Sequence, residues 1–211
     1  MTQMLDVDRL VLGPLGTNVY IVSNRKTSEA VIIDPAAKPM EIMRCIQKYH
    51  FEPKAILLTH GHFDHLLAAN ELAHEYGIPV YASQKDEWMI KKPTFEGHDF
   101  SAYAVTRYTK IETSELDLID MKWKVIQTPG HSPGSVCYYI EDEKILFSGD
   151  TLFRGSFGRT DFEGGSMADL VISICEKLFV LPDDITVYPG HEDETNLGIE
   201  KIYNEIKEIN K

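Results

Sequence analysis

Four side chains that can bind a metal ion fall within six residues of this chain. They are His60, His62, Asp64 and His65. They follow the short apolar run 55–58, which predicts a strand. Imidazole and carboxylate ligands without thiolates suit Zn²⁺, Fe or Mn, and they are more typical of a catalytic metal site than of a structural zinc site. The segment therefore predicts a metal centre at the turn after a strand, and a solvated polar loop is the alternative interpretation.

Three more candidate ligands stand in turn-rich segments, each after a predicted strand. His131 lies in Thr-Pro-Gly-His-Ser-Pro-Gly, Asp150 in Phe-Ser-Gly-Asp-Thr and His191 in Tyr-Pro-Gly-His-Glu. Any one of them alone would more often be a turn residue or a hydrogen-bonded core group than a ligand. Because they accompany the first four candidates, we interpret all three as ligands.

The other three histidines lack such surroundings. His50 and His74 are expected on helix surfaces. His98 lies in an irregular stretch from about 91 to 110, and its role stays open. None of the three is predicted to bind metal.

Strands and helices in two runs must position these ligands. Apolar and β-branched runs bounded by turn residues predict strands at 10–12, 19–22, 30–33, 55–58, 78–81, 123–127, 135–140, 144–148 and 186–188. Helical spacing predicts helices at 40–49, 64–76, 84–90, 167–179 and 194–207. The two runs predict an α/β protein, an αββα sandwich in which two mixed sheets pack face to face with the helices outside. We find no linker or repeat and expect a single domain over residues 1–211.

The charge balance argues against two classes of partner. Lys and Arg total 21 against 33 Asp and Glu, which gives a formal net charge of -12, and no basic cluster stands out. Such a surface repels phosphate backbones and anionic membranes, so we expect no nucleic-acid partner and no membrane partner. A small-molecule substrate is the expected partner, and the sequence specifies no oligomeric state.

The cysteines and the N-terminal segment indicate a reducing compartment. Cys45, Cys137 and Cys175 are odd in number and widely spaced, so neither a disulfide framework nor a thiolate zinc site is predicted. Residues 1–12 include two aspartates and no apolar core of signal-peptide length, and no later run is long enough to cross a bilayer. We expect a soluble, cytoplasmic protein.

The pattern His-X-His-X-Asp-His at 60–65, with His131, Asp150 and His191, resembles the metallo-β-lactamase superfamily. The resemblance spans nearly the whole chain. Within that superfamily, the segments 149–153, 158–159 and 187–192 are similar to the glyoxalase II branch, the hydroxyacylglutathione hydrolases. Classical zinc β-lactamases usually carry Cys where this chain has Asp150, so the resemblance argues against antibiotic hydrolysis.

The resemblance implies a site for two metal ions. It assigns His60, His62 and His131 to the first metal, Asp64, His65 and His191 to the second, and Asp150 to a bridge between them. Seven ligands in two incomplete shells leave room for a bridging water, and two cations lower the pKa of that water enough to supply hydroxide near neutral pH. We expect two divalent transition-metal ions, Zn first, with Fe or Mn as alternatives.

The implied reaction is the hydrolysis of an acyl thioester such as S-lactoylglutathione. Hydroxide attacks the carbonyl, a metal stabilises the oxyanion, and the thiolate leaves without a protein acid. Asp64 takes a catalytic role beside its role as ligand, because it orients the nucleophilic water. Arg159 matches a basic position near the glutathione moiety and is the expected substrate-binding residue, because arginine can grip a carboxylate. Pairing of Arg159 or Arg154 with a neighbour such as Asp161 or Glu163 is the alternative interpretation.

Two features keep other functions open. Longer glyoxalase II proteins have a helical C-terminal extension that helps to hold glutathione, whereas this chain ends 20 residues after His191, so it resembles the shorter members. For these, an S-acylglutathione, another acyl thioester and an unrelated ester all stay open. Segments 154–155 and 158–162 also resemble the persulfide dioxygenases, which use one iron, so a mononuclear-iron sulfur dioxygenase is the alternative enzyme. A metal-binding protein without catalysis is the third hypothesis.

Overall fold

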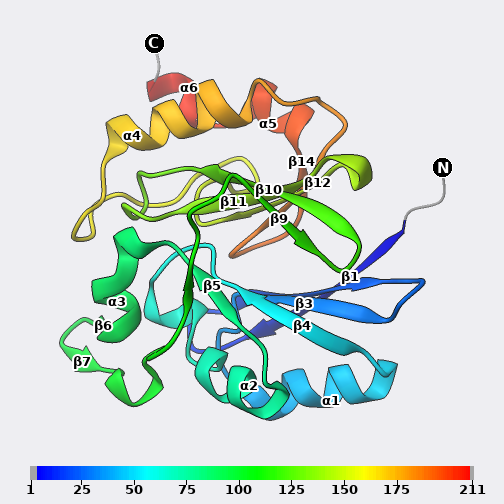
Figure 1. Cartoon of the computed structure of the whole chain (residues 1–211). Helices are drawn as coiled ribbons and strands as arrows, with labels where there is room; N and C mark the ends of the chain where they lie inside the picture. The colour runs from blue at the N-terminus through cyan, green and yellow to red at the C-terminus, as the bar shows by residue number, and fades with distance from the viewer. Residues whose placement is uncertain (1–3, 210–211) are drawn as a thin grey trace.

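The computed structural model describes residues 4–209, and its first sheet has six strands in the order β1-β2-β3-β4-β5-β8 (Figure 1). These are β1 (Leu5–Leu12), β2 (Thr17–Asn24), β3 (Glu29–Ile33), β4 (Glu52–Leu57), β5 (Val80–Ala82) and β8 (Thr109–Lys110). The first three strands are antiparallel and the later ones parallel. Parallel neighbours need a long connection, and helices α1 (Pro39–Tyr49) and α2 (Ala69–Tyr76) provide two of them.

The second sheet has the order β14-β13-β12-β11-β10-β9. Its strands are β9 (Glu115–Leu118), β10 (Met121–Gln127), β11 (Val136–Ile140), β12 (Ile145–Gly149), β13 (Thr186–Pro189) and β14 (Thr195–Asn196). All neighbours are antiparallel except β12 and β13, whose connection contains α4 (Met167–Ile172) and the π-helical turns Ser173–Leu178. Helices α5 (Leu197–Tyr203) and α6 (Ile206–Ile209) follow. Both sheets are therefore mixed, as predicted.

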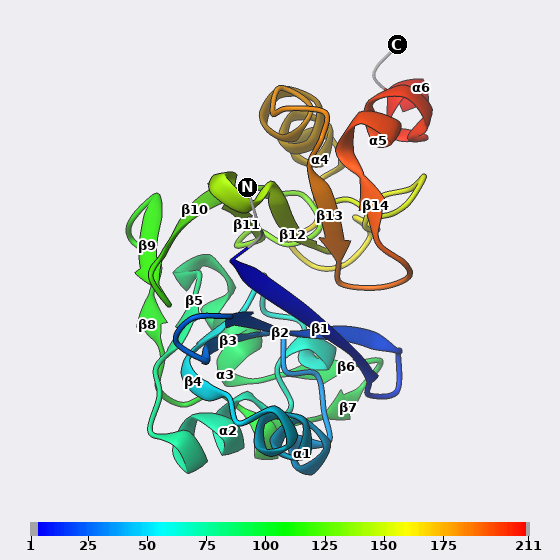
Figure 2. The ribbon, with the colours of Figure 1, turned by 90° about the vertical axis from the view of Figure 1, so that its right-hand side faces the viewer.

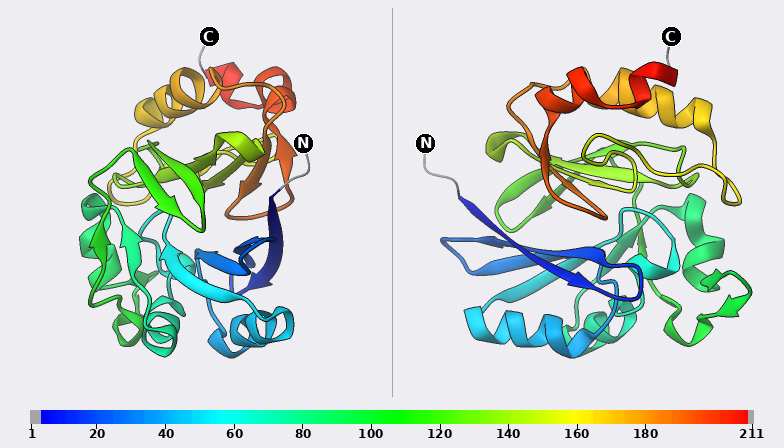
Figure 3. Two further views of the ribbon diagram at one scale, coloured as in Figure 1. Left: turned by 45° about the vertical axis from the view of Figure 1, so that its right-hand side comes forward. Right: turned by 180° about the vertical axis from the view of Figure 1, so that it is seen from behind.

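The sheets lie face to face, with α1 and α2 outside the first and α4, α5 and α6 outside the second (Figures 1, 2 and 3). Buried side chains alternate between the two faces of the central strands. On β2, Val19 and Ile21 pack in the apolar cluster under the helices, whereas Tyr20 and Val22 pack between the two sheets. Because both faces are covered, such strands are continuous apolar runs. The predicted αββα sandwich is confirmed.

A small lobe stands at one end of the sandwich. It consists of α3 (Glu87–Lys91) and a hairpin of β6 (Thr94–Phe95) and β7 (His98–Asp99), drawn at the left of Figure 1. The stretch expected to be irregular from 91 to 110 therefore contains this hairpin. A 3₁₀ turn and the short β8 follow it.

The helix predicted over 64–76 is wrong in its first turns. Residues Phe63–His65 form a single 3₁₀ turn, and Leu66 has φ -132°, outside the helical range. The α-helix begins only at Ala69 and ends at Gly77, whose φ of 64° closes it as the sequence predicts. The predicted helix is interrupted before Ala69 because Asp64 and His65 point into the ligand cluster described below.

The helix predicted over 194–207 is also wrong at its start. Residues Thr195–Asn196 pair with β13 as an edge strand, and the helix begins at Leu197. The Asn196 side chain accepts a hydrogen bond from the backbone of Ile199 and caps the helix.

Strand β9 was not predicted. Within residues 4–209, no helix combines the length and apolar character needed to cross a membrane.

Candidate metal centre

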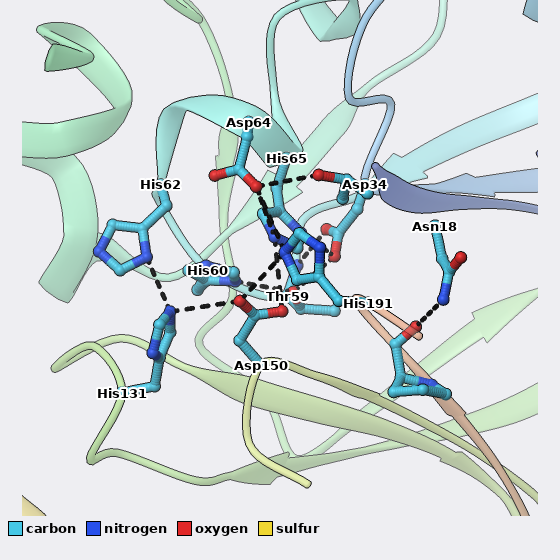
Figure 4. A network of polar contacts seen from close by, with 12 residues as sticks. Asn18, Asp34, Thr59, His60, His62, Asp64, His65, His131, Asp150 and His191 are labelled. Atoms are coloured by element: carbon cyan, nitrogen blue, oxygen red, sulfur yellow. Dashed lines mark hydrogen bonds and ion pairs between the residues drawn. The ribbon is translucent and has the colours of Figure 1, made fainter. Parts of the chain in front are cut away.

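All seven predicted ligands meet at one edge of the two sheets. Each ligand segment follows the end of a strand: the segment 60–65 follows β4, and His131, Asp150 and His191 follow β10, β12 and β13. Figure 4 shows the side chains converging from these loops. The histidines not predicted as ligands, His50, His74 and His98, are exposed and lie outside the cluster.

The ligands form two groups. Among the described residues, His60, His62 and His131 make one set of three possible ligand atoms within 4.8 Å of one another, and Asp64, His65 and His191 make a second. A third such set, Asp34, His60 and His65, takes one histidine from each group. In the first group, Nδ1 of His62 lies 2.8 Å from Nε2 of His131. In the second, Nε2 of His65 and of His191 lie 3.4 Å and 3.3 Å from Oδ2 of Asp64.

Asp150 lies between the two groups. Its Oδ1 faces Nε2 of His65 at 3.5 Å. Its Oδ2 faces Nε2 of His131 at 3.5 Å and Nε2 of His191 at 3.4 Å. One carboxylate therefore contacts ligands of both groups, which is the arrangement expected of a bridging residue.

Unpartnered buried atoms show that the cluster fits metal ions. Nε2 of His60, Nε2 of His65 and Oδ1 of Asp150 are buried and have no hydrogen-bond partner in residues 4–209. Buried polar groups are rarely left unpaired, because the loss of hydration is costly. Imidazole nitrogens and carboxylates with inward lone pairs are the donor set that a transition-metal ion prefers. The residues present therefore fit two metal ions.

Asp34, which the sequence did not reveal as a site residue, fixes the orientation of two ligands. Its Oδ2 accepts hydrogen bonds from Nδ1 of His65 at 2.9 Å and from Oγ1 of Thr59 at 2.6 Å. The Thr59 hydroxyl in turn lies 3.0 Å from Nδ1 of His60. Because the outer nitrogens of both rings are engaged, their Nε2 atoms are the nitrogens that face the cluster and would bind a metal ion. The sequence feature that could have identified Asp34 is its position directly after an apolar strand, as for Asp150.

Two further contacts hold the remaining ligands. Nδ1 of His131 donates to the backbone oxygen of Arg159 at 2.7 Å, so its Nε2 faces the cluster. The hydroxyl of Thr17, at the start of β2, donates to Oδ2 of Asp64 at 2.9 Å. Partners of this kind set the orientation of a metal ligand before the ion arrives.

Asp86 ties together the two loops that carry the first group of ligands. Its Oδ2 accepts from the backbone of Gly61 at 2.9 Å and from the hydroxyl of Ser132 at 2.6 Å. Its Oδ1 accepts from the backbone of Gly134 at 2.6 Å. The side chain is fully buried, and burial raises its pKa. The sequence placed Asp86 inside a helix and offered no signal of this role.

Glycine is required where the loops approach most closely. A Cβ atom on Gly190 would lie 2.2 Å from Oδ1 of Asp150 and 2.8 Å from Cε1 of His65. Gly149 has φ 49°, in the left-handed region, and a Cβ there would lie 2.4 Å from Oγ1 of Thr59. Side chains at these positions would displace the ligands.

Protonation differs between the two groups in the protein alone. Burial, with the charges of its histidine neighbours, holds the pKa of His60 well below its ordinary value and lowers that of His62 to about 3. In the second group, burial opposes the charged imidazole, yet hydrogen bonds to Asp150 and Asp64 raise the pKa of His191 to about 9. The pKa of Asp150 lies well below its ordinary value despite burial, because of His65 and His191. Metal binding to this group must therefore displace protons.

A cleft of about 680 Å³ opens over the ligands. His62, Asp64, His131, Asp150 and His191 are part of its lining. The walls include aromatic side chains from several loops and from α3. A small molecule in the cleft can therefore reach both groups of ligands.

Arg159 also lines the cleft, but its guanidinium is engaged. Nε and Nη2 donate to the two carboxylate oxygens of Asp161 at 2.6 Å and 2.5 Å. The guanidinium carbon lies 4.2 Å from the ring centroid of Phe162. Both interpretations of Arg159 are therefore visible, a cation at the cleft and a residue paired with its neighbour. Arg154 is exposed and outside the lining.

Two ligand groups at the loop edge of an αββα sandwich, with a carboxylate between them, define a metal-binding protein of catalytic type. The chain belongs to the metallo-beta-lactamase superfamily, whose sequence pattern it matches over residues 12–191.

Curated relatives in this superfamily are similar along most of their length. The "Probable metallo-hydrolase YqgX" of Bacillus subtilis is 36% identical over 201 residues, which cover 93% of this chain and 94% of that protein. The "Hydroxyacylglutathione hydrolase GloC" of Haemophilus influenzae is 34% identical over 181 residues, covering 83% of this chain and 85% of that protein. A metallo-hydrolase is therefore the class supported for this chain.

Solved structures of similar proteins share the fold. BLEG-1, described as a B3 metallo-beta-lactamase, has 36% identity and a TM-score of 0.86, covering 95% of this chain and 98% of its own. TTHA1623 in a di-iron-bound form has 35% identity and a TM-score of 0.83, covering 94% and 99%. ETHE1 from Myxococcus xanthus has 27% identity and a TM-score of 0.77, covering 95% and 83%.

Proposed function

We propose that this protein hydrolyses acyl thioesters at a centre of two metal ions. One observation carries the proposal: Asp150 stands between two groups of ligands on the floor of an open cleft. His60, His62 and His131 would hold one ion and Asp64, His65 and His191 the other, with Asp150 between them. When bound, the ions supply Lewis-acid activation of a water molecule and of the substrate carbonyl.

Asp64 has the geometry for a second role. Its Oδ2 is engaged by Thr17 and faces His65 and His191. Its Oδ1 makes no hydrogen bond within residues 4–209, and the side chain lines the cleft. Oδ1 is therefore free to accept a hydrogen bond from the attacking water and to orient it.

The leaving group explains the choice of a thioester. Water oxygen bonds to the acyl carbon, the carbon–sulfur bond breaks, and the products are a carboxylate and a thiol. Thiolates leave without protonation, whereas a poorer leaving group needs an acid. Among the described residues, the cleft lining contains no lysine or tyrosine, and its glutamates, Glu96, Glu163 and Glu192, are exposed. The hydroxyacylglutathione hydrolase activity in the name of GloC supports the same substrate class.

Arg159 is the proposed contact for an anionic carrier such as glutathione. It is the single arginine of the described cleft lining, which holds no lysine. A carboxylate of the substrate would have to share the guanidinium with Asp161. The contact would bind the carrier without touching the reacting bond.

The test is hydrolysis of S-lactoylglutathione by metal-replete protein, and the release of free thiol is measured to monitor the reaction. The protein has three free cysteines of its own, so catalytic amounts are required. Asp150→Ala should lose bound metal and activity, whereas His98→Ala, an exposed residue, should keep its metal content. Equal loss of metal in both variants would refute the assignment of Asp150.

A sulfur dioxygenase is the second candidate, because segments 154–155 and 158–162 resemble those of the persulfide dioxygenases. Oxygen uptake with glutathione persulfide by a protein that binds one iron would favour it. The similarity to BLEG-1 also makes a β-lactam a necessary control substrate, although Asp150 argues against it. Turnover of either compound without thioester hydrolysis would overturn the proposal.

A further inference from the structure

The cleft over the ligands has a continuous aromatic wall. Phe63, Phe95 and Phe162 line it from three segments, the 3₁₀ turn after β4, strand β6 and the loop after Arg159. The rings of Phe63 and Phe95 stack with centroids 4.9 Å apart, and Phe162 meets Phe95 edge-on at 6.3 Å. Phe162 also lies edge-on to His62, at 5.2 Å. The wall therefore begins at a metal ligand and continues outward.

Apolar side chains also reach the second group of ligands. The ring of Phe153 lies 6.2 Å from that of His191, edge-on. Trp88 and Met89 of α3 line the cleft as well. If the carbonyl carbon of a thioester lies at the ligand cluster, its acyl side chain therefore contacts apolar surface beside either group of ligands.

Polar partners for a small hydroxyacyl group are scarce beside this wall. Outside the ligand cluster, four polar residues of the lining are exposed, Thr94, Glu96, Glu163 and Glu192. Ser156 is half-buried, and Arg159 is paired with Asp161. A hydroxyl group buried against phenyl rings loses its hydration without a replacement, whereas a ring or a branched alkyl group gains from the contact.

We propose that the cleft selects thioesters with a large apolar acyl group, such as phenylacetyl, over small hydroxyacyl groups such as lactoyl. This inference rests on the proposed thioester hydrolysis and names its substrate class. The aromatic wall supplies the discrimination, because one or two carbons buried in an apolar pocket already change kcat/KM about tenfold or more.

The first test varies only the acyl group on one carrier. S-phenylacetylglutathione should be hydrolysed with a kcat/KM at least about tenfold above that of S-lactoylglutathione. Phe95→Ala should remove most of this advantage, which is measured as the ratio of the two kcat/KM values. A result in which the lactoyl substrate is equal or better would overturn the inference and leave the proposed function intact.

Phe100→Ala is the matched control. The rings of Phe95 and Phe100 both stack on Phe63, at 4.9 Å and 4.6 Å, but Phe100 does not line the cleft. Phe100→Ala should keep the preference for phenylacetyl. If Phe100→Ala and Phe95→Ala lose it equally, packing of the lobe is responsible and the wall does not select. Circular dichroism and the conservative Phe95→Leu, which should keep most of the preference, separate selection from unfolding.

The second test needs neither metal nor turnover. Trp88 is 45% exposed in the cleft lining, and the other tryptophan, Trp123, is fully buried between the sheets. Titration of metal-free protein with neutral phenylacetamide should change the tryptophan fluorescence in a saturable way, lactamide should not, and Trp88→Phe should abolish the change. If phenylacetamide binds but no thioester is hydrolysed, the proposed function fails and the preference of the cleft stands. Equal responses to both amides would overturn the preference.

Discussion

Asp86→Asn isolates the role of a buried carboxylate that touches no metal ligand side chain. Asp86 receives three hydrogen bonds, from the backbone of Gly61 and Gly134 and from the hydroxyl of Ser132. The amide keeps the shape but offers one acceptor oxygen, so its NH₂ group must face at least one of these donors. The two loops that carry the first group of ligands would then lose their common anchor.

The magnitude follows from two opposing effects. A lost hydrogen bond to a charged group and a buried donor left unpaired together cost about 3 to 5 kcal/mol. Burial raises the pKa of Asp86, so the amide also relieves the cost of a buried charge. We expect a net loss of about 2 to 3 kcal/mol in the free energy of unfolding, together with a metal affinity about 10-fold to 100-fold lower.

Two measurements on the same protein test this expectation. Urea denaturation of the metal-free protein gives the free energy of unfolding, and competition with a chelator gives metal affinity. Asp169→Asn, the same exchange at an exposed position in the first turn of α4, is the control; it should lower the free energy of unfolding by less than about 1 kcal/mol and leave metal affinity unchanged. Stability lowered as expected, with metal affinity within twofold of the wild type, would refute the link between Asp86 and the ligand loops.

Three further outcomes are expected. Arg159→Ala should raise KM for an S-acylglutathione about tenfold, or about 1.4 kcal/mol, with kcat changed less; an equal loss on an uncharged thioester would make Arg159 structural. Gly190→Ala should destabilise the protein by about 1 to 3 kcal/mol and lower its metal content, because the new Cβ would lie 2.2 Å from Oδ1 of Asp150; full metal occupancy would contradict this. The pKa of His191 is raised from 6.5 to about 9, so its stabilising effect on the metal-free protein is complete below pH 6.5 and is lost as the pH rises through about 9. We expect up to about 3 kcal/mol to be lost across this range in thermal or urea unfolding, and His191→Asn should remove this component; an identical pH dependence in wild type and variant would exclude it.

The ligands could be predicted because they either lie close together in the sequence or directly follow a predicted strand. Four ligands are close in sequence, and the other three follow strands that end at the same edge of the sandwich. Apolar runs bounded by turn residues likewise predicted most strands of the two sheets. Both features depend on short-range spacing, which the sequence records directly.

Contacts between distant residues could not be predicted in the same way. Asp34 and Asp86 lie 31 and 46 residues away from His65 and Ser132, their hydrogen-bond partners, and no local pattern marks those pairings. The turn at Phe63–His65 has helix-forming neighbours, so tertiary requirements of the ligands override local propensity there. The aromatic wall likewise joins rings from three separate segments.

Metal stoichiometry tests the central claim most directly. Elemental analysis of metal-replete protein should give about two transition-metal ions per chain, because the two groups of ligands lie on either side of Asp150. Asp150→Ala, measured beside it, should bind neither ion tightly. Saturation of the wild-type protein at one iron per chain would contradict the two-metal centre and the hydrolase proposed on it.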